Sequence, residues 1–415
     1  MTLYAGTVYI PCRVRAPVLD LITSILILLV VAIGLGQIFD SMELPEVVGA
    51  IIAGIILGPA VTGIIHPSSE LTTISLLALF FIILQIGIEA SADIFSKNIR
   101  YITGFALTAF VVPFLVMSAG SYFIFGLPYL EAVSISLSVS IPSISITSVL
   151  LVRSGLIRTE DGLRLLGGVA MSDAVGFIIL VSFHMPVLTI AIDSVSLAVF
   201  VVALYFLDLF LKSRSDRIMI RVARYNKLEK EGIIFAVVIV MGLAVSSLFE
   251  YIGITFVLGA FFSGLVIHQN SVGENTYGIL TRTFRRINSS FFIPMFFSIS
   301  GLAISVISIS MLPYLAFLIL ITASIGGLAA YQFSKSFMKS IPPTASLGIF
   351  GGRGAVGIII ASISLSNGFI SNAYYSIAVF ATVIMAISFT LVFHHSLRRH
   401  VSSPQDAIGE KRPGS

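Results

Sequence analysis

Long apolar runs follow one another along almost the whole chain, and they constrain the fold more than any other feature. Each run of about 18 or more apolar residues can cross a bilayer as a helix. Only 11% of the 415 residues are charged, against about 25% in ordinary soluble domains. We therefore expect an all-α polytopic membrane protein. The first run has no small-residue cleavage site and is expected to remain as a helix.

The distribution of positive charge sets the predicted topology. All Lys and Arg residues but three fall in loops or tails on one side: Arg13 and Arg15 lie on the other side, and Arg353 lies inside a span. Cytoplasmic loops are rich in Lys and Arg, so we expect an outer N-terminus and a cytoplasmic C-terminus in the cell (inner) membrane. The basic charge then reflects topology and gives no reason to expect a nucleic-acid partner. The 13 predicted transmembrane helices are 17–39, 44–64, 71–90, 102–126, 129–152, 163–183, 187–211, 232–249, 253–268, 290–309, 312–334, 342–365 and 373–396.

One predicted span carries an acid near its middle. The run 162–181, GLRLLGGVAMSDAVGFIILV, places Asp173 at bilayer depth among small residues. A charged carboxylate at that depth costs roughly 2.5–3.5 kcal/mol even on the lenient insertion scales, so its presence indicates a function. We expect Asp173 to bind a transported monovalent cation or a proton.

Two other spans are interrupted. The run 134–151, SISLSVSIPSISITSVLL, has Pro142 at its centre, and 341–360, IPPTASLGIFGGRGAVGIII, has Gly352, Arg353 and Gly354. Non-helical backbone survives at membrane depth only where it is buried in protein or lines a polar cavity. Freed carbonyls and hydroxyl oxygens suit hard cations; the predicted hydroxyl ligands are Ser140, Ser143 and Thr147, together with Ser172 beside Asp173. The alternative is a proline kink whose hydroxyls bond back to their own helix.

The two interruptions also predict internal symmetry. Broken segments at corresponding positions of two halves are typical of a transport site. Spans 2–6 and 9–13 would form two inverted five-helix repeats, in which the broken fifth and twelfth helices cross.

The predicted chemistry is competition for one carboxylate. Desolvation favours the protonated form of a buried acid, and a bound cation favours the ionised form. The acid would cross the membrane neutral, either with H⁺ or with Na⁺ or K⁺, so exchange near 1:1 follows. No cofactor beyond the transported ion is expected.

Seven stretches together resemble the monovalent cation:proton antiporters, most closely the Kef-like and bacterial Na⁺/H⁺ exchanger branch. They are LPEVVGAIIAGIILGPA, GIEASADIF, SIPSISITSVLL, GGVAMSDAVGFIIL, LGAFFSGLVI, FFIPMFFSISGLAI and GGRGAVGIII, in the order seen in that family. The resemblance implies a homodimer in the lipid bilayer. It also implies dimerisation helices (17–90), the first half of a transport core (102–183), dimerisation helices of the second repeat (253–309) and the second half of the core (312–396). The charge pattern and composition add an outer segment (1–16), linker helices with a basic inner loop (187–249) and a disordered inner tail (397–415).

Some positions depart from the family pattern. Asp173 matches the ion-binding aspartate, but Ser172 stands where relatives have Asp or Asn. Gly168 replaces a Glu that pairs, in one branch, with an Arg like Arg353, and Ile141 replaces an Asp before Pro142. The departures leave one acid at the site, as in electroneutral relatives. Arg353 then has either a structural role at a helix end or a direct role in transport.

Other functions stay open. An organic-anion/Na⁺ symporter on a similar crossed-helix fold would need more basic residues in the core, where only Arg353 qualifies. A cation channel or a sensor subunit is a second alternative. An intramembrane hydrolase would need a second catalytic group at the depth of Asp173, and none is present in the sequence, so we do not expect an enzyme.

Overall fold

The computed structural model describes residues 20–89, 100–143, 147, 150–151, 156, 159–182, 227–251, 256–267, 273–338, 341 and 343–401. Within these ranges the chain is all-helical apart from one isolated β-bridge. Seven helices there are long and apolar enough to cross a membrane, and two further apolar helices are shorter. The predicted span 187–211 and most of both predicted tails lie outside the described residues, so the count of 13 spans stays a prediction.

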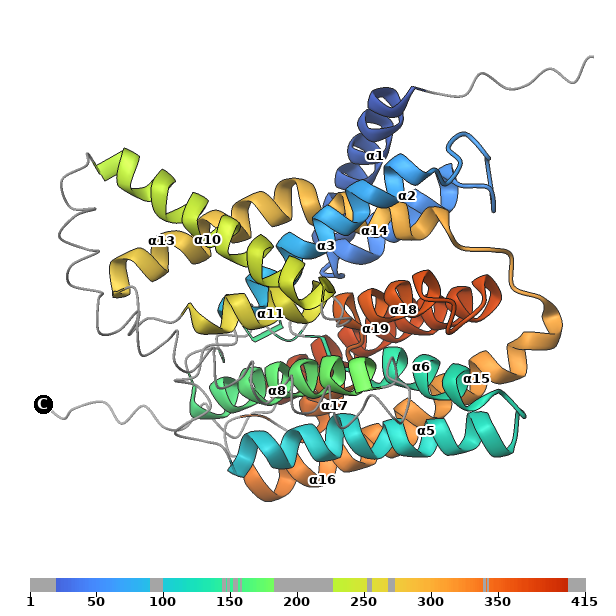
Figure 1. Cartoon of the computed structure of the whole chain (residues 1–415). Coiled ribbons are helices and arrows are strands. Elements are labelled where there is room, and N and C mark those ends of the chain that lie inside the picture. The colour runs from blue at the N-terminus through green and yellow to red at the C-terminus, as the bar shows by residue number, and fades with distance from the viewer. Residues whose placement is uncertain are drawn as a thin grey trace, which may run out of the picture.

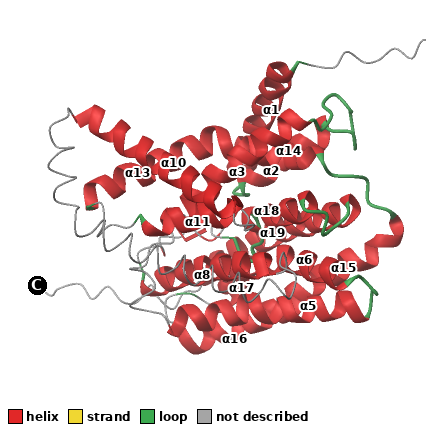
Figure 2. Cartoon of the chain, in the orientation of Figure 1, coloured by secondary structure: helices red, strands yellow, loops and turns green. Residues whose placement is uncertain are grey.

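The helices follow the order of the apolar runs, as Figures 1 and 2 show. Their bounds are α1 Leu21–Ser41, α2 Glu46–Leu57, α3 Ser69–Glu89, η1 Leu107–Val111, α5 Val112–Phe123, α6 Tyr129–Ser140, α8 Glu160–Ser182, α10 Lys227–Tyr251, α11 Phe256–Val266, α13 Glu274–Ile287, η3 Asn288–Phe292, α14 Ile293–Leu302, η4 Ile309–Met311, α15 Leu312–Ile321, η5 Thr322–Gly326, α16 Gly327–Phe337, α17 Pro343–Gly351, α18 Ala355–Ser366 and α19 Asn372–Val401.

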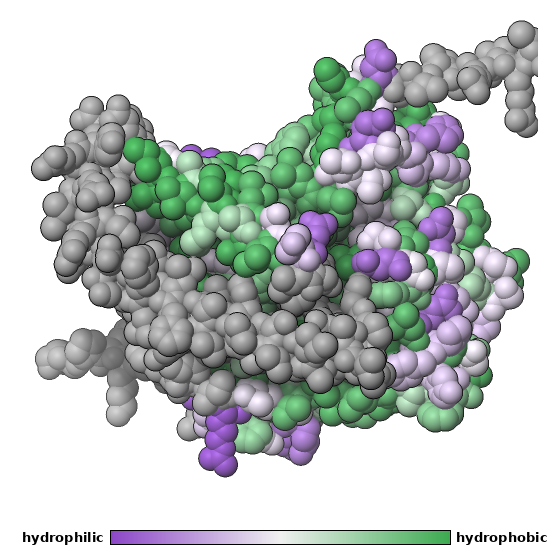
Figure 3. Space-filling model, viewed as in Figure 1, coloured by the Kyte–Doolittle hydropathy of each residue, from purple (hydrophilic) through white to green (hydrophobic). Residues whose placement is uncertain are grey.

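The helices form two layers that lie one above the other in Figure 1. We call the upper layer the scaffold layer; it holds α1, α2, α3, α10, α11, α13 and α14. We call the lower layer the crossing layer; it holds α5, α6, α8 and α15 to α19. The outer faces of α1 and α10 expose large apolar side chains, such as Ile22 (79% exposed) and Val240 (66%). An apolar surface over one side of the molecule is also visible in Figure 3 and suits contact with lipid.

Small residues allow the scaffold helices to pack backbone to backbone. A Cβ added at Gly54 in α2 would collide with the Ser298 carbonyl oxygen and approach Gly301 in α14. In the same way, a Cβ at Gly87 in α3 would collide with the Phe261 carbonyl oxygen and approach Gly264 in α11. Close approach at small residues is the usual way in which membrane helices associate.

Three π-helical turns, η1, η3 and η5, widen the long helices. Val112 N–H donates to the Leu107 carbonyl oxygen in η1, and Ile293 N–H donates to Asn288 in η3, each five residues back. A proline follows each of these two turns at the second position of the next helix, Pro113 or Pro294. A proline inside the predicted span 290–309, Pro294, favours a break in that helix, and this prediction from the sequence is wrong. The helix runs on from Glu274 to Leu302, because the wider turn makes room for the proline ring.

Candidate functional site

Two interrupted helices meet at one point in the crossing layer. Helix α6 ends at Ser140, and Ile141 is extended, with φ −73° and ψ 123°. Pro142 and Arg353 form an isolated antiparallel bridge, and Ser143 N–H donates to the Gly352 carbonyl oxygen at 2.9 Å. Helix α17 ends at Gly351 and α18 begins at Ala355. The two predicted interruptions therefore form one extended crossing, held by backbone contacts between Pro142–Ser143 and Gly352–Arg353.

Asp173 is completely buried in the middle of α8. Neither carboxylate oxygen has a hydrogen-bond partner among the described residues. One turn further on, a Cβ at Gly176 would collide with the Ile141 side chain and lie 3.7 Å from Ile360. Residues three apart share a helix face, so Asp173 lies on the face of α8 that packs on the crossing. The acid neither faces lipid nor pairs with a base in the described part of the chain.

The hydroxyl groups near the crossing differ in their contacts. Ser140 donates back to the Ser136 carbonyl oxygen, and Ser172 donates back to Gly168 at 2.9 Å. Both follow the alternative in which a hydroxyl bonds to its own helix, although their oxygen lone pairs remain able to accept. Thr147 differs, because its buried Oγ1 has no hydrogen-bond partner among the described residues. Of these three hydroxyl groups, only that of Thr147 makes no hydrogen bond to a described residue.

Arg353 is completely buried beside the crossing. Its Nη2 donates to the Ala109 carbonyl oxygen at 3.3 Å, and Nε and Nη1 have no partner among the described residues. The residue follows the C-terminus of α17 and bridges to Pro142, just after the C-terminus of α6. A positive charge near helix C-termini is favourable, which agrees with a structural role at the helix ends.

Gly168 packs too closely against a neighbouring helix to be replaced by an acid without a shift. A Cβ there would collide with the ring of Phe105, which is 1% exposed. A glutamate side chain would need that ring to move. Where one branch of the family has a Glu, this chain has Gly168, and α8 packs closely there against the helix that carries Phe105.

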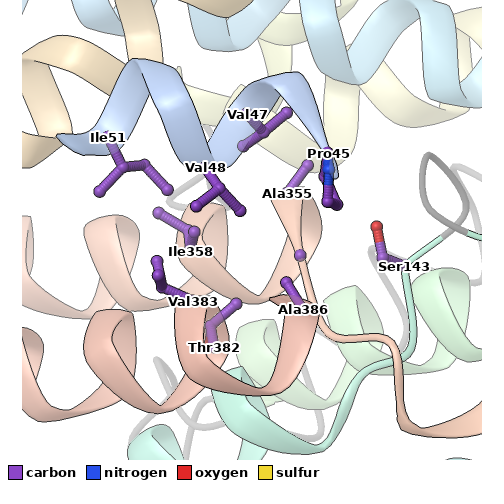
Figure 4. Close-up of a pocket in the computed structure, with 11 residues that line it drawn as sticks. Pro45, Val47, Val48, Ile51, Ser143, Ala355, Ile358, Thr382, Val383 and Ala386 are labelled. Atoms are coloured by element: carbon purple, nitrogen blue, oxygen red, sulfur yellow. The ribbon is translucent and has the colours of Figure 1, made fainter. Parts of the chain in front are cut away.

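A small cavity of about 20 Å³, with room for one or two water molecules, lies between α2 and the crossing layer (Figure 4). Its polar lining residues are Ser143, at the crossing, and Thr382, whose hydroxyl donates to Ala378 at 2.8 Å. The other lining residues are apolar or glycine: Pro45, Val47, Val48, Ile51, Gly354, Ala355, Ile358, Val383 and Ala386. The cavity joins the interface between the layers to the broken segments.

Comparison with known families decides what this arrangement is. The sequence profile described as "Sodium/hydrogen exchanger, transmembrane" matches residues 25–398, which is nearly the whole chain. The chain belongs to the sodium/hydrogen exchanger family. The exchanger is therefore a multi-pass membrane transporter and not an enzyme.

Individual relatives of the exchanger agree with that assignment. It is 25% identical over 385 residues to a Na⁺/H⁺ antiporter of Enterococcus hirae, covering 91% of this chain and 98% of the relative. It is also 25% identical over 366 residues to the Na⁺/H⁺-K⁺ antiporter GerN of Bacillus cereus, covering 86% and 90%. The solved sodium proton antiporter MjNhaP1 of Methanocaldococcus jannaschii superposes with a TM-score of 0.66 at 14% identity, covering 92% of this chain and 97% of that structure. This last likeness shows the fold.

Sequence reasoning missed the partner of Arg353. The signal was present, because a proline inside an apolar run leaves the carbonyl four residues earlier without its helical donor. Pro113 marks Ala109 in this way. Nothing local in the sequence indicates which donor, 244 residues further on, would reach that oxygen.

Proposed function

We propose that this exchanger moves Na⁺ or K⁺ against H⁺ by alternating access at one carboxylate, that of Asp173. The observation that carries the proposal is the complete burial of this side chain with both oxygens unpartnered in the described residues. An isolated buried charge is costly, so the acid needs either a proton or a cation when it is enclosed. The two ions then compete for the same oxygens.

The ligands that we propose around a bound cation are oxygens. Thr147 Oγ1 is unpartnered among the described residues, Ser143 lines the cavity beside the crossing, and Ser140 and Ser172 offer hydroxyl lone pairs. Monovalent hard cations take such oxygen ligands. Pro142, Gly352 and Gly354 keep the crossing segments out of helical geometry. The positive charge of Arg353 offsets the partial negative charge of the helix C-termini there.

We infer a homodimer of 13-helix protomers, with two inverted five-helix repeats and an outer N-terminus. In support, the scaffold layer has two similar glycine contacts, α2 with α14 and α3 with α11, which inverted halves would produce. The two broken helices that cross belong to opposite halves of the chain. The scaffold layer would carry the dimer contact, and the crossing layer would carry the ion.

The decisive experiment measures cation-dependent proton movement in proteoliposomes. Asp173→Asn should abolish it while purification yield and melting temperature stay close to those of the unmodified protein. Asp161→Asn is the matched control on the same helix, because Asp161 pairs with Arg164 at 3.2 Å and lies away from the crossing. Exchange at the normal rate in Asp173→Asn would refute the assignment.

The choice of cation needs its own measurement. The relative GerN is named for both Na⁺ and K⁺, so both are candidates here. Exchange should be measured with Na⁺, K⁺ and Li⁺ in turn. An organic-anion symporter is disfavoured by the cavity of about 20 Å³, which holds no more than a few atoms. Uptake of a labelled carboxylate together with Na⁺ would favour that alternative.

A further inference from the structure

We propose that Tyr375 and Ser376 are positioning residues for exchange, because from α19 they hold the end of α14 and close one side of the interface between the two layers. This inference rests on the proposed alternating-access function. It concerns four contacts that join α14 and the chain just after it to the crossing layer. Their members, which we call the hydroxyl latch, are Ser300, Ser305, Ser362, Tyr375 and Ser376.

The first part of the latch involves the Tyr375 hydroxyl. It donates to the Ser300 carbonyl oxygen at 2.9 Å, and the tyrosine is 1% exposed. Ser300 lies in the last turn of α14, where its carbonyl oxygen accepts only a long bond, 3.3 Å, from Ala303 N–H within the chain's own turn and has a second lone pair for the tyrosine. Ser362 of α18 completes this part, with its Oγ 3.4 Å from Ser300 Oγ and 3.5 Å from the Tyr375 hydroxyl. A helix end in one layer is thus capped by a side chain from the other layer.

The second part of the latch lies in the chain just after α14. Ser305 N–H donates to Ser376 Oγ at 2.8 Å, and the two serine hydroxyl oxygens are 3.1 Å apart. Ser376 uses its own proton to bond the Asn372 carbonyl oxygen at 2.7 Å. The Ser305 hydroxyl must therefore be the donor in the contact between the two serines. Ser376, which is fully buried, accepts twice from Ser305, in the connection that follows α14.

The latch and the cavity occupy successive levels of the same interface. Thr382 and Ala386, which line the cavity, lie on α19 seven or more residues beyond Tyr375, about 10 Å along the helix. Ile358 of α18 lines the cavity, and Ser362, one turn later, belongs to the latch. The interface is therefore joined at the level of the latch and hollow at the level of the crossing.

Alternating access gives this arrangement a role. A carrier must open its ion site to each side in turn, so the two layers must separate where they are now joined. Hydrogen bonds between neutral groups are suited to this, because water replaces each of them when the layers part. The latch then favours the state seen here and must open once in every cycle.

A reversible cross-link tests whether the latch opens. The chain's single cysteine, Cys12, is first replaced by serine. Ser305→Cys/Ser376→Cys places two thiols where hydroxyls lie 3.1 Å apart, close enough for a disulfide. Oxidation should abolish exchange in proteoliposomes, and reductant should restore it. If fully cross-linked protein exchanges as fast as the same protein after treatment with reductant, the proposal is overturned.

A matched pair controls for the cross-link itself. Ser396 donates to Thr344 Oγ1 at 2.6 Å, joining α19 to α17 within the crossing layer. Oxidised Thr344→Cys/Ser396→Cys should exchange at the same rate before and after reduction. Loss of exchange in this pair as well would show that any disulfide stops transport, which would also count against the latch.

A second measurement needs no transport activity. In a Cys12→Ser/Ser362→Cys background, Tyr375→Phe removes the donor to Ser300 and keeps the ring. The thiol introduced at position 362 should then react several-fold faster with a membrane-impermeant thiol reagent added from the side of the α14–α15 connection. Equal reactivity with tyrosine and phenylalanine would overturn the latch. If the unmodified protein shows no cation–proton exchange but reactivity rises, the proposed function and the role of the latch in exchange fail, while the closure of this interface by the latch stands.

Discussion

Arg353 Nη2 donates to the carbonyl oxygen of Ala109, at 3.3 Å, in the first π-helical turn of the crossing layer. Pro113, four residues after Ala109, has no N–H and cannot supply the usual helical bond. The proline thus makes a backbone acceptor available inside the protein, and the buried guanidinium uses it. The second π-helical turn of this layer is also adjacent, because a Cβ at Gly326 would lie 3.6 Å from Arg353 Nη2.

Replacing Pro113 should therefore weaken the hydrogen bond from Arg353 to the Ala109 carbonyl oxygen. In Pro113→Ala the new N–H can compete for the Ala109 oxygen. Loss of a hydrogen bond to a charged group, about 1.5 kcal/mol, corresponds to about a tenfold slower exchange if its whole effect falls on the rate. Initial rates in proteoliposomes measure this effect.

Pro294→Ala is the control for that substitution. Pro294 also follows a π-helical turn, but in α14 of the scaffold layer, whereas Arg353 bonds Ala109 in η1. Exchange in Pro294→Ala should stay near the normal rate. An equal loss in the two variants would mean that any proline after a π-helical turn matters for folding, and the particular role of Pro113 would be lost.

The hydroxyls near the crossing should differ in their effect on cation affinity. Thr147 Oγ1 is buried without a partner among the described residues, and Ser143 lines the cavity, so Thr147→Ala and Ser143→Ala should raise the apparent KM for the cation several-fold with less change in the maximal rate. Ser138 donates to the Ile135 carbonyl oxygen at 2.8 Å and is the control, because Ser138→Ala removes only a bond within its own helix. Exchange rates against cation concentration give both constants. Unchanged KM in both Thr147→Ala and Ser143→Ala would remove these residues from the site.

The sequence was enough to predict most of the apolar helices that the structure describes, the crossing and the burial of Asp173, because each has a local cause. Apolar runs must be helical in lipid, Pro142 and the glycines around Arg353 interrupt helices, and an acid in a long apolar run is enclosed by protein. The sequence did not reveal the partner of Arg353 or the hydroxyl latch. Tyr375 and Ser300 meet only through the packing of distant helices, and isolated serines in separate spans carry no pairing signal.

Close packing at Gly168 predicts a cost in stability. A Cβ there collides with the Phe105 ring, so Gly168→Ala should destabilise the protein by about 1–3 kcal/mol, the usual range for overpacking. Thermal unfolding in detergent should show a lower melting temperature, and Phe105→Leu should restore part of the loss. Gly34→Ala is the control, because a Cβ there meets nothing within 4 Å and alanine favours helix. Equal melting temperatures for Gly168→Ala and the unmodified protein would show that the ring moves freely.

A single carboxylate at the site predicts that the rate of exchange does not depend on the membrane potential. If Asp173 carries one cation or one proton in each direction, no net charge crosses the membrane in a cycle. A potential of about 100 mV would otherwise change the driving force by about 2.3 kcal/mol for each net charge moved. Initial Na⁺/H⁺ exchange rates should therefore be equal in proteoliposomes held at zero and at imposed potentials of either sign, and the pH gradient at equilibrium should match the Na⁺ gradient. A pH gradient that shifts with the imposed potential would require a second charge in the cycle, and Arg353, the other fully buried charged side chain in the described residues, would be the first group to test.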